Sequence, residues 1–346
     1  MQAAATLPSR TSNKRNRPFW REALRPYARP HLGRSLADIL TSVVPYIGLS
    51  VAMYSLLDVS YLLVLVVGVP TAGFLLRTYI LFHDCTHGSF LPSKRANLWL
   101  GITLGLVVWT PFHNWRHAHQ VHHATSGDLD RRGEGDVPTW TVAEYYGAGL
   151  WARFGYRLFR NPLIMFGLGP LWALVIQPRL VSLSARPRLR NSVFATNLAL
   201  VVLVGLLILW IGWQPFLLVW LPPVMLAGAV GVWLFYVQHQ FEDAYWECSD
   251  DWSYADAALR GSSHLKLPKV LQFFTGNIGL HHVHHLSARI PNYNLQRAHD
   301  ENPIFHDVPT LTIWDGLKAV RLKLWDEDQR RLVTWAEARR SRAAAG

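Results

Sequence analysis

The chain has 346 residues, of which 50% are hydrophobic and only 16% are charged. A soluble domain usually carries about 25% charged residues, so this composition argues against a soluble protein and favours an integral membrane protein. The net charge of +11 would suit a nucleic-acid-binding protein, but the Lys and Arg residues are scattered over segments that flank long apolar runs. That distribution is typical of cytoplasmic loops, and we expect no nucleic-acid partner.

The chain begins with a basic segment, residues 1–38, whose first basic residues are Arg10, Lys14, Arg15 and Arg17. Four apolar segments then occur that are long enough to cross a bilayer: Ile39–Leu57, Tyr61–Phe82, Phe194–Trp213 and Phe216–Gln238. Very short links within each pair predict two helical hairpins. Basic residues precede each hairpin and are missing from the short links. The positive-inside rule therefore predicts cytoplasmic termini and cytoplasmic long connections.

Two further apolar stretches, Leu98–Phe112 and Leu163–Gln177, are each about 15 residues long, which is short for a membrane span. We interpret them as re-entrant or interfacial helices. If either crossed the membrane, the histidine clusters on its two sides would lie on opposite faces and could not share one metal site.

Three histidine clusters have the spacing of one face of a helix. They are His83 with His87, then His119 with His122 and His123, then His281 with His284 and His285; His282 stands inside the third cluster but outside this spacing. Each cluster can aim two or three imidazoles at one point, and eight such imidazoles are too many for one tetrahedral zinc. The clusters therefore predict a two-metal centre. His83 and His87 extend the second apolar helix, and His239 stands just past the fourth.

The ligand types narrow the choice of metal. Without a cysteine-rich set, structural zinc is disfavoured, and the clusters contain too few carboxylates for a carboxylate-rich di-iron bundle. An all-imidazole shell with many ligands suits iron, while copper and zinc remain open. Among the nearby acids, Asp84, Glu242 and Asp243 are candidates for orienting imidazoles through the second ring nitrogen.

These segments resemble the three histidine boxes of the membrane fatty acid desaturases. The first is His83-Asp84-Cys85-Thr86-His87-Gly88, the second runs from Pro111 to His123, and the third from Gly276 to Leu286, followed by Ile290-Pro291-Asn292-Tyr293-Asn294. The resemblance covers roughly Ile39 to Pro303 and is closest to the omega-6/delta-12 type that acts on acyl lipids, including its bacterial members. It implies an all-α integral membrane fold, with four transmembrane helices in two hairpins and a cytoplasmic helical cap that carries the metal site.

The resemblance also implies a chemistry and a ligand set. A di-iron centre would use O2 and two electrons to remove two hydrogens from an acyl chain and leave a cis double bond. Its ligands by position are His83, His87, His119, His122, His123, His239, His281, His284 and His285. In some desaturases an asparagine one turn before the histidine at position 239 holds an iron through water; here that position is Phe235, and Asn277 is one substitute candidate. Supporting or positioning roles are expected for Asp84, His113, Trp115, Arg116, His117, Asn277 and His282.

The expected partners are a fatty acyl substrate, most readily an acyl lipid, membrane lipid, and a separate ferredoxin-like or cytochrome electron donor. The expected location is a bacterial inner membrane, with the termini and the active site in the cytoplasm. A related hydroxylase, ketolase or epoxidase would use the same histidine boxes, and a metal transporter is the alternative from another class. Residues 39–303 would form the desaturase domain and 304–346 an amphipathic cytoplasmic tail. Within that tail, residues 310–335 are predicted to form one surface helix.

Overall fold

The computed structural model describes residues 18–133 and 135–345, so the basic residues Arg10, Lys14, Arg15 and Arg17 lie outside the described residues. Four described helices are long and apolar enough to cross a membrane: α2 (Leu32–Ser55), α3 (Tyr61–His87), α8 (Pro187–Ile211) and α9 (Trp213–His239). They coincide with the four predicted apolar segments, although α2 and α8 begin earlier and end two residues earlier than predicted. The four helices are confirmed, while the two hairpins within a membrane stay a prediction.

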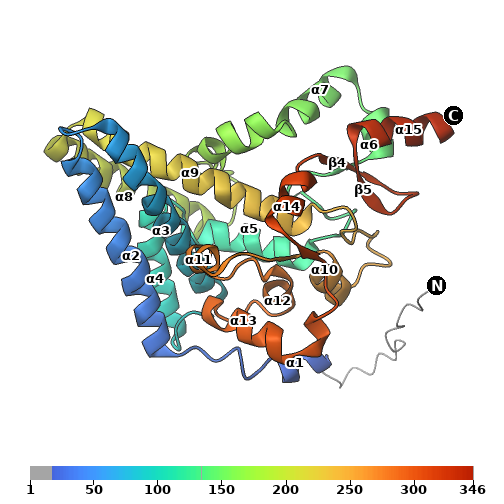
Figure 1. Cartoon of the computed structure of the whole chain (residues 1–346), viewed down its shortest axis with the longest axis horizontal. Coiled ribbons are helices and arrows are strands. Elements are labelled where there is room, and N and C mark those ends of the chain that lie inside the picture. The colour runs from blue at the N-terminus through green and yellow to red at the C-terminus, as the bar shows by residue number, and fades with distance from the viewer. Residues whose placement is uncertain (1–17, 134, 346) are drawn as a thin grey trace.

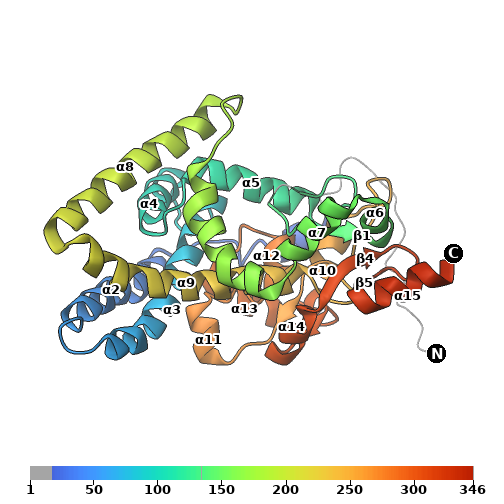
Figure 2. The same cartoon turned by 90° about the horizontal axis from the view of Figure 1, so that it is seen from above.

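The two helix pairs differ in how their helices lie relative to each other. Helices α2 and α3 lie side by side, and the Thr71 hydroxyl of α3 contacts the Met53 sulfur of α2 at 3.4 Å. Helices α8 and α9 meet at Gly212 and spread apart from it (Figure 2). Gly212 has a φ of 86°, a conformation that glycine adopts without the steric penalty of a side chain.

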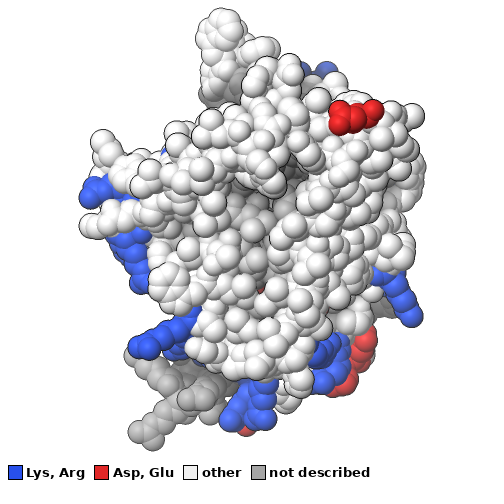
Figure 3. Space-filling view, turned by 90° about the vertical axis from the view of Figure 1, so that its left-hand side faces the viewer, with Lys and Arg blue, Asp and Glu red and all other residues white. Residues whose placement is uncertain are grey.

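The face that the spanning helices present is almost free of charge. Figure 3 shows it as a broad uncharged surface, with Lys and Arg gathered mainly along its lower rim and sides. One charge that does occur within a span, Arg77 of α3, is buried and paired with Asp38 of α2 at 2.7 Å. A charge in such a place needs a partner, because burying it alone is costly. The pair therefore ties α2 to α3.

Helices α3 and α9 both continue past their apolar runs and end on histidines. Helix α3 stops at Gly88, which has a φ of 67°, while the backbone N–H of Ser89 donates to the Asp84 carbonyl at 3.1 Å. A glycine in the left-handed conformation is a common helix stop. Because α3 ends only after His87, it carries His83 and His87 beyond the apolar segment, as predicted. Helix α9 likewise ends at His239.

In the chain, the two helix pairs are separated first by α4 (Lys94–Val107) and then by α5 (Phe112–Thr125), which carries the second histidine cluster. The stretch Leu163–Gln177 folds as π-helical turns, Ile164–Leu168 and Leu171–Ile176, that end in a 3₁₀ turn at Gln177–Arg179. Together with α7 (Leu150–Phe159) it forms a pair bent by 60°, the geometry of a broken span or a re-entrant segment. The prediction that this stretch does not cross a membrane stays untested.

A layer of short helices covers the ends of α3, α5 and α9 that carry histidines (Figure 1). It contains α1 (Phe19–Ala23), α10 (Tyr254–Arg260), α11 (Lys269–Phe274), α12 (His281–Leu286) and α13 (Asn292–Glu301). The parallel strands β2 (His264–Leu265) and β3 (Thr310–Leu311) join this layer to the start of the C-terminal region. Val283, Leu286 and Leu295 are among the residues of its core.

The prediction of one helix over residues 310–335 is wrong. After α14 (Ile313–Ala319) the chain forms an antiparallel hairpin of β4 (Leu322–Asp326) and β5 (Arg331–Thr334), and the tail ends in α15 (Trp335–Ala345). Strand β1 (Trp140–Thr141) adds to β4 in parallel, just before α6 (Val142–Gly147). Strand β4 is buried at every residue, so its apolar side chains pack on both faces, which helical periodicity does not describe. The fold is mostly helical rather than all-α.

Candidate metal centre

All nine histidines predicted as ligands come together, but they form two groups. Site A consists of His83, His87, His119, His123 and His284; site B consists of His122, His239, His281 and His285. Within each site the candidate ligand nitrogens lie within 4.8 Å of one another. This arrangement agrees with the predicted two-metal centre.

The first histidine cluster aims at one point, since His83 and His87 both belong to site A, but the second and third clusters are divided between the sites, contrary to our expectation. In α5, His119 and His123 belong to site A while His122 belongs to site B. In α12 the assignment is reversed, since His281 and His285 belong to site B and His284 to site A. Residues four apart share a helix face, whereas adjacent residues diverge by about 100°. Both helices therefore contribute to both sites and hold them next to each other.

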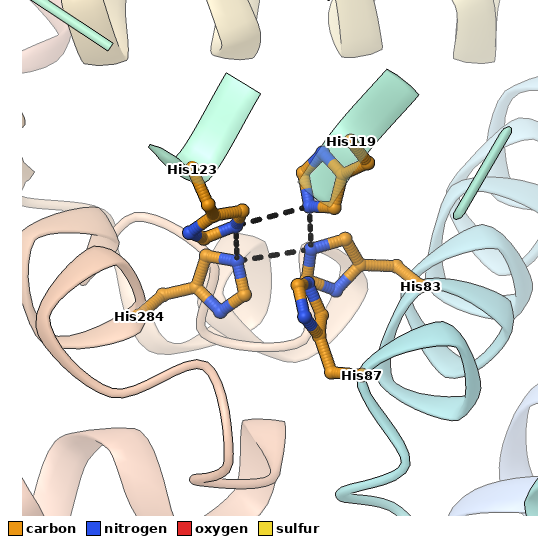
Figure 4. A group of neighbouring side chains, drawn as sticks. All are labelled: His83, His87, His119, His123 and His284. Atoms are coloured by element: carbon orange, nitrogen blue, oxygen red, sulfur yellow. Dashed lines mark hydrogen bonds between the residues drawn. The ribbon is translucent and has the colours of Figure 1, made fainter. Parts of the chain in front are cut away.

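Four imidazoles of site A form a closed ring through their Nε2 atoms (Figure 4). The Nε2–Nε2 distances are 3.0 Å for His83–His119, 3.2 Å for His119–His123, 2.9 Å for His123–His284 and 3.1 Å for His284–His83. The ring of His87 lies against this set, and its Nε2 is buried without a hydrogen-bond partner among the described residues. Five ring nitrogens therefore converge on one small volume.

Site B is built in the same way from four histidines. The Nε2 atoms of His122 and His285 are 3.2 Å apart, and those of His239 and His281 are 2.9 Å apart. The rings of His123 and His285, one from each site, stack at 4.2 Å between centroids. The two sites are therefore in direct contact.

The hydrogen bonds of the Nδ1 atoms, opposite the converging Nε2 atoms, test whether a metal fits. A neutral imidazole carries one N–H and one lone pair. The Nδ1 atoms of His83, His122 and His239 face the Asp84 carboxylate, the Asp136 carboxylate and the Gly261 carbonyl, so these Nδ1 atoms carry the proton. Their Nε2 lone pairs then point at other imidazole nitrogens, where a cation would satisfy them together. The donor set fits two metal ions.

Protonation of the histidines outside the spanning helices is disfavoured. Burial, reinforced by neighbouring imidazoles, lowers the pKa of His119, His123 and His284 well below the usual value. The same causes lower the pKa of His281 and His285. These side chains are therefore neutral at ordinary pH, the form in which imidazole binds metal.

Each site has one histidine that faces a buried carboxylate. Asp84 contacts His83 Nδ1 at 3.1 Å, and its second oxygen accepts from the backbone and side chain of Asn292 at 2.7 and 3.1 Å. This contact is the one expected of a carboxylate that orients an imidazole, and that role of Asp84 stays a prediction. The candidate Glu242 instead forms an ion pair with Arg331 and has an exposed side chain. Asp243 is exposed and makes no contact with either site in the described structure.

Sequence reasoning missed Asp136, the carboxylate that faces His122. Gly135 brings it there, because a Cβ at this position would lie 2.8 Å from the Ala118 carbonyl oxygen of α5. Only a glycine lets the loop approach the helix this closely, and its φ of 78° favours glycine as well. A glycine followed by an aspartate outside the histidine clusters was the only signal in the sequence, and it is a weak one.

The residues expected to support the site have varied surroundings. Trp115 stacks on His119 at 4.4 Å, and the backbone N–H of His113 donates to Ser192 Oγ at 3.1 Å. Arg116 and His117 lie on α5 outside both sites. His282 contacts His299 at 3.0 Å between ring nitrogens, also outside both sites.

Two further positions bear on the resemblance. Asn277 donates to the Asn292 carbonyl at 3.2 Å and belongs to neither site. Phe235 packs against His122 and His239, with ring centroids 5.1 and 5.6 Å apart. An apolar ring therefore covers site B at the position where the resemblance led us to look for an asparagine.

Comparisons with known proteins agree with this geometry. A family model described as "Fatty acid desaturase" matches residues 59–312. A Bacillus subtilis (strain 168) protein named "Fatty acid desaturase" is 48% identical over 309 residues, covering 89% of this chain and 88% of that protein. An "sn-1 oleoyl-lipid 12-desaturase" of Synechocystis sp. is 28% identical over 66% of this chain and 65% of its own length. An "sn-1 acyl-lipid omega-3 desaturase (ferredoxin)" of the same organism is 30% identical over 64% of this chain and 62% of its own length.

Proposed function

The chain belongs to the fatty acid desaturase family and is an oxidoreductase, and we propose that it introduces a cis double bond into the acyl chain of a membrane lipid at a centre of two iron ions. The observation that carries the proposal is the convergence of nine buried or half-buried imidazoles into two adjacent sites at helix ends. The related proteins named as acyl-lipid and oleoyl-lipid desaturases support a lipid-linked acyl chain as substrate.

The residues of the two sites have separate tasks in this proposal. The five histidines of site A would hold one iron and the four of site B the other. Bound iron would supply the activation of O2, and the balanced reaction takes up two electrons and two protons, removes two hydrogens from adjacent methylenes and releases two waters. Asp84 and Asp136 keep the protons of His83 and His122 on Nδ1, so that the Nε2 lone pairs face the metals.

The reaction takes up two electrons, and we propose that another protein supplies them. One relative is named with ferredoxin, which supports a ferredoxin-like donor, and a cytochrome is the alternative. Such donors are often acidic, and basic segments flanking the spanning helices would attract them. The positive-inside rule places these segments, including Arg186, Arg188 and Arg190 at the start of α8, in the cytoplasm. We therefore propose an active site on the cytoplasmic side of a bacterial inner membrane.

Mass spectrometry of lipids from cells that express the protein tests the proposed function. A desaturase lowers the mass of an acyl chain by two units, whereas a hydroxylase, ketolase or epoxidase adds oxygen. His122→Ala should abolish desaturation and reduce bound iron while leaving membrane insertion intact. His306→Ala is the matched control, because His306 is exposed and belongs to neither site. Full desaturation by His122→Ala would refute the ligand assignment.

A further inference from the structure

An open pocket of about 480 Å³ lies between α6, α7 and α15 and is lined mainly by arginines. Helix α7 contributes Arg153 and Arg157, and α15 contributes Arg339 and Arg342. Tyr145 and Tyr146 of α6, with Ala343, complete its lining, and no aspartate or glutamate of the described residues takes part. Four positive charges thus surround one cavity.

The arginines of α7 are held in place by neutral groups. Arg153 donates from Nε to the Ala148 carbonyl at 2.7 Å and from Nη2 to the Tyr146 carbonyl. Arg157 donates from Nε to the Tyr145 hydroxyl at 2.6 Å and lies 5.0 Å from the centre of the Trp335 ring. These contacts orient both guanidinium groups and leave the Nη atoms of Arg157 without a hydrogen bond inside the described structure.

The arginines of α15 are exposed and have fewer contacts. Arg342 lies over the Tyr146 ring at 4.5 Å, and Arg339 makes no hydrogen bond within the described residues. Among the residues that the structure describes, none of the four pocket arginines forms an ion pair with a carboxylate. Arg331, by comparison, pairs with both Glu242 and Glu337. The pocket therefore keeps four guanidinium groups uncompensated.

Four neighbouring cations repel one another, and an anion between them would remove that repulsion. Guanidinium groups present paired N–H donors that match the oxygens of a phosphate. The tyrosine rings add donors and cation–π partners without adding negative charge. The chemistry of this pocket therefore favours a phosphate group.

Helix α7 indicates where that phosphate comes from. Leu150, Trp151, Phe154 and Leu158 are exposed by 81%, 86%, 58% and 47%. An apolar row beside basic residues on one short helix is typical of a helix that lies in the membrane interface. Helix α7 also leads into the bent apolar segment that packs on α9, and it extends from there towards α6 and α15 (Figure 1). We propose that the pocket binds the phosphate of a membrane lipid headgroup while the apolar row of α7 lies among the acyl chains.

Native mass spectrometry of the full-length protein in a nonionic detergent tests this site. The probes are phosphatidylglycerol and a galactolipid that lacks phosphate. The protein should retain phosphatidylglycerol and not the galactolipid. Each of Arg339→Gln and Arg342→Gln should weaken retention about fivefold, and the double variant roughly 25-fold, since each basic residue near a membrane contributes about one such factor.

Two controls separate this site from general charge effects. Arg340→Gln removes the same charge from the same helix outside the pocket and should leave retention unchanged. Arg342→Lys keeps the charge but loses the paired N–H donors, and should retain more binding than Arg342→Gln and less than the wild type. Unchanged retention by the double variant, or equal losses in Arg340→Gln and Arg342→Gln, would overturn the proposal.

A competition arm separates the two sources of phosphate. Inorganic phosphate at the same concentration should not displace phosphatidylglycerol, because it lacks the acyl chains that contact α7. Displacement would identify a site for a soluble anion instead and overturn the lipid assignment. The readout is independent of desaturation, so failure here leaves the proposed function intact, and failure of the desaturation assay leaves this site intact.

Discussion

Replacing Asp136 with alanine should weaken metal binding at site B alone. The Asp136 carboxylate accepts a hydrogen bond from His122 Nδ1, and their side chains are 7% and 0% exposed. Asp136 contacts no histidine of site A in the described structure. Without it, the Nδ1 proton of His122 has no acceptor in a place that water does not reach, and the ring loses its orientation and part of its basicity.

The magnitude follows from the position of Asp136 behind a ligand. Loss of a hydrogen-bond partner behind a metal-binding histidine lowers metal affinity about 10–100-fold, or about 1.4–2.7 kcal/mol. Because the loss affects one site, iron per chain should fall from two to one at a chelator concentration where the wild type keeps both. Asp136→Asn should recover part of the affinity, since its amide oxygen accepts the same hydrogen bond without the charge.

The assay is a chelator titration of purified protein, with bound iron measured by elemental analysis and the remaining iron examined by Mössbauer spectroscopy. Asp328→Ala is the control, because Asp328 is exposed in the turn between β4 and β5 and its loss changes the net charge equally. One of two spectral components should disappear from Asp136→Ala. Loss of both irons together, or retention of both, would refute the assignment of Asp136 to site B.

Two further predictions concern stability. Burial lowers the pKa of His264 to about 4, so between pH 6.5 and 4 the unfolded chain takes up a proton that the folded chain does not, and stability falls as the pH falls. Over this pH range the free energy of unfolding of the wild type should fall by about 1 kcal/mol more than that of His264→Gln, a figure reduced for solvent screening. Thermal melting at several pH values measures this difference, and an equal pH dependence in the two proteins would contradict the prediction. Gly101→Ala should destabilise the protein by about 1–3 kcal/mol, because the added Cβ would lie 2.2 Å from the Phe112 ring at the start of α5. Gly48→Ala in α2, where nothing lies within 4 Å, should be neutral or slightly stabilising, and equal melting temperatures for the two variants would refute the clash.

The long helices and most of the ligand candidates could be predicted because their signals are local. An apolar run of sufficient length predicts a spanning helix wherever it packs, and α2, α3, α8 and α9 follow the runs closely. Spacings of three and four residues place imidazoles on related helix faces without knowledge of their neighbours. His239 was harder, since it is a single histidine, and its position at the end of α9 was the useful clue.

Features that join distant segments were missed or predicted wrongly. Residues 322–326 pair with 331–334 and with β1, which lies far away in the chain, so the local pattern at 310–335 was misread as a helix. The approach of Asp136 to His122 depends on the contact of Gly135 with α5. The arginine pocket likewise joins α7 to α15, which nearly two hundred residues separate.

The amino-acid sequence by itself indicated three histidine clusters with helical spacing, placed the first at the end of an apolar helix, and predicted a two-metal centre from the number of imidazoles. Only the tertiary structure decided which histidine serves which site. His122 and His123 are neighbours in the chain, yet they belong to different sites, as do His284 and His285. The reason is geometric, because adjacent side chains on a helix diverge by about 100° and one helix can therefore face two sites. The contacts of the α5 histidines with His83, His285 and His239 decide which site each ring joins.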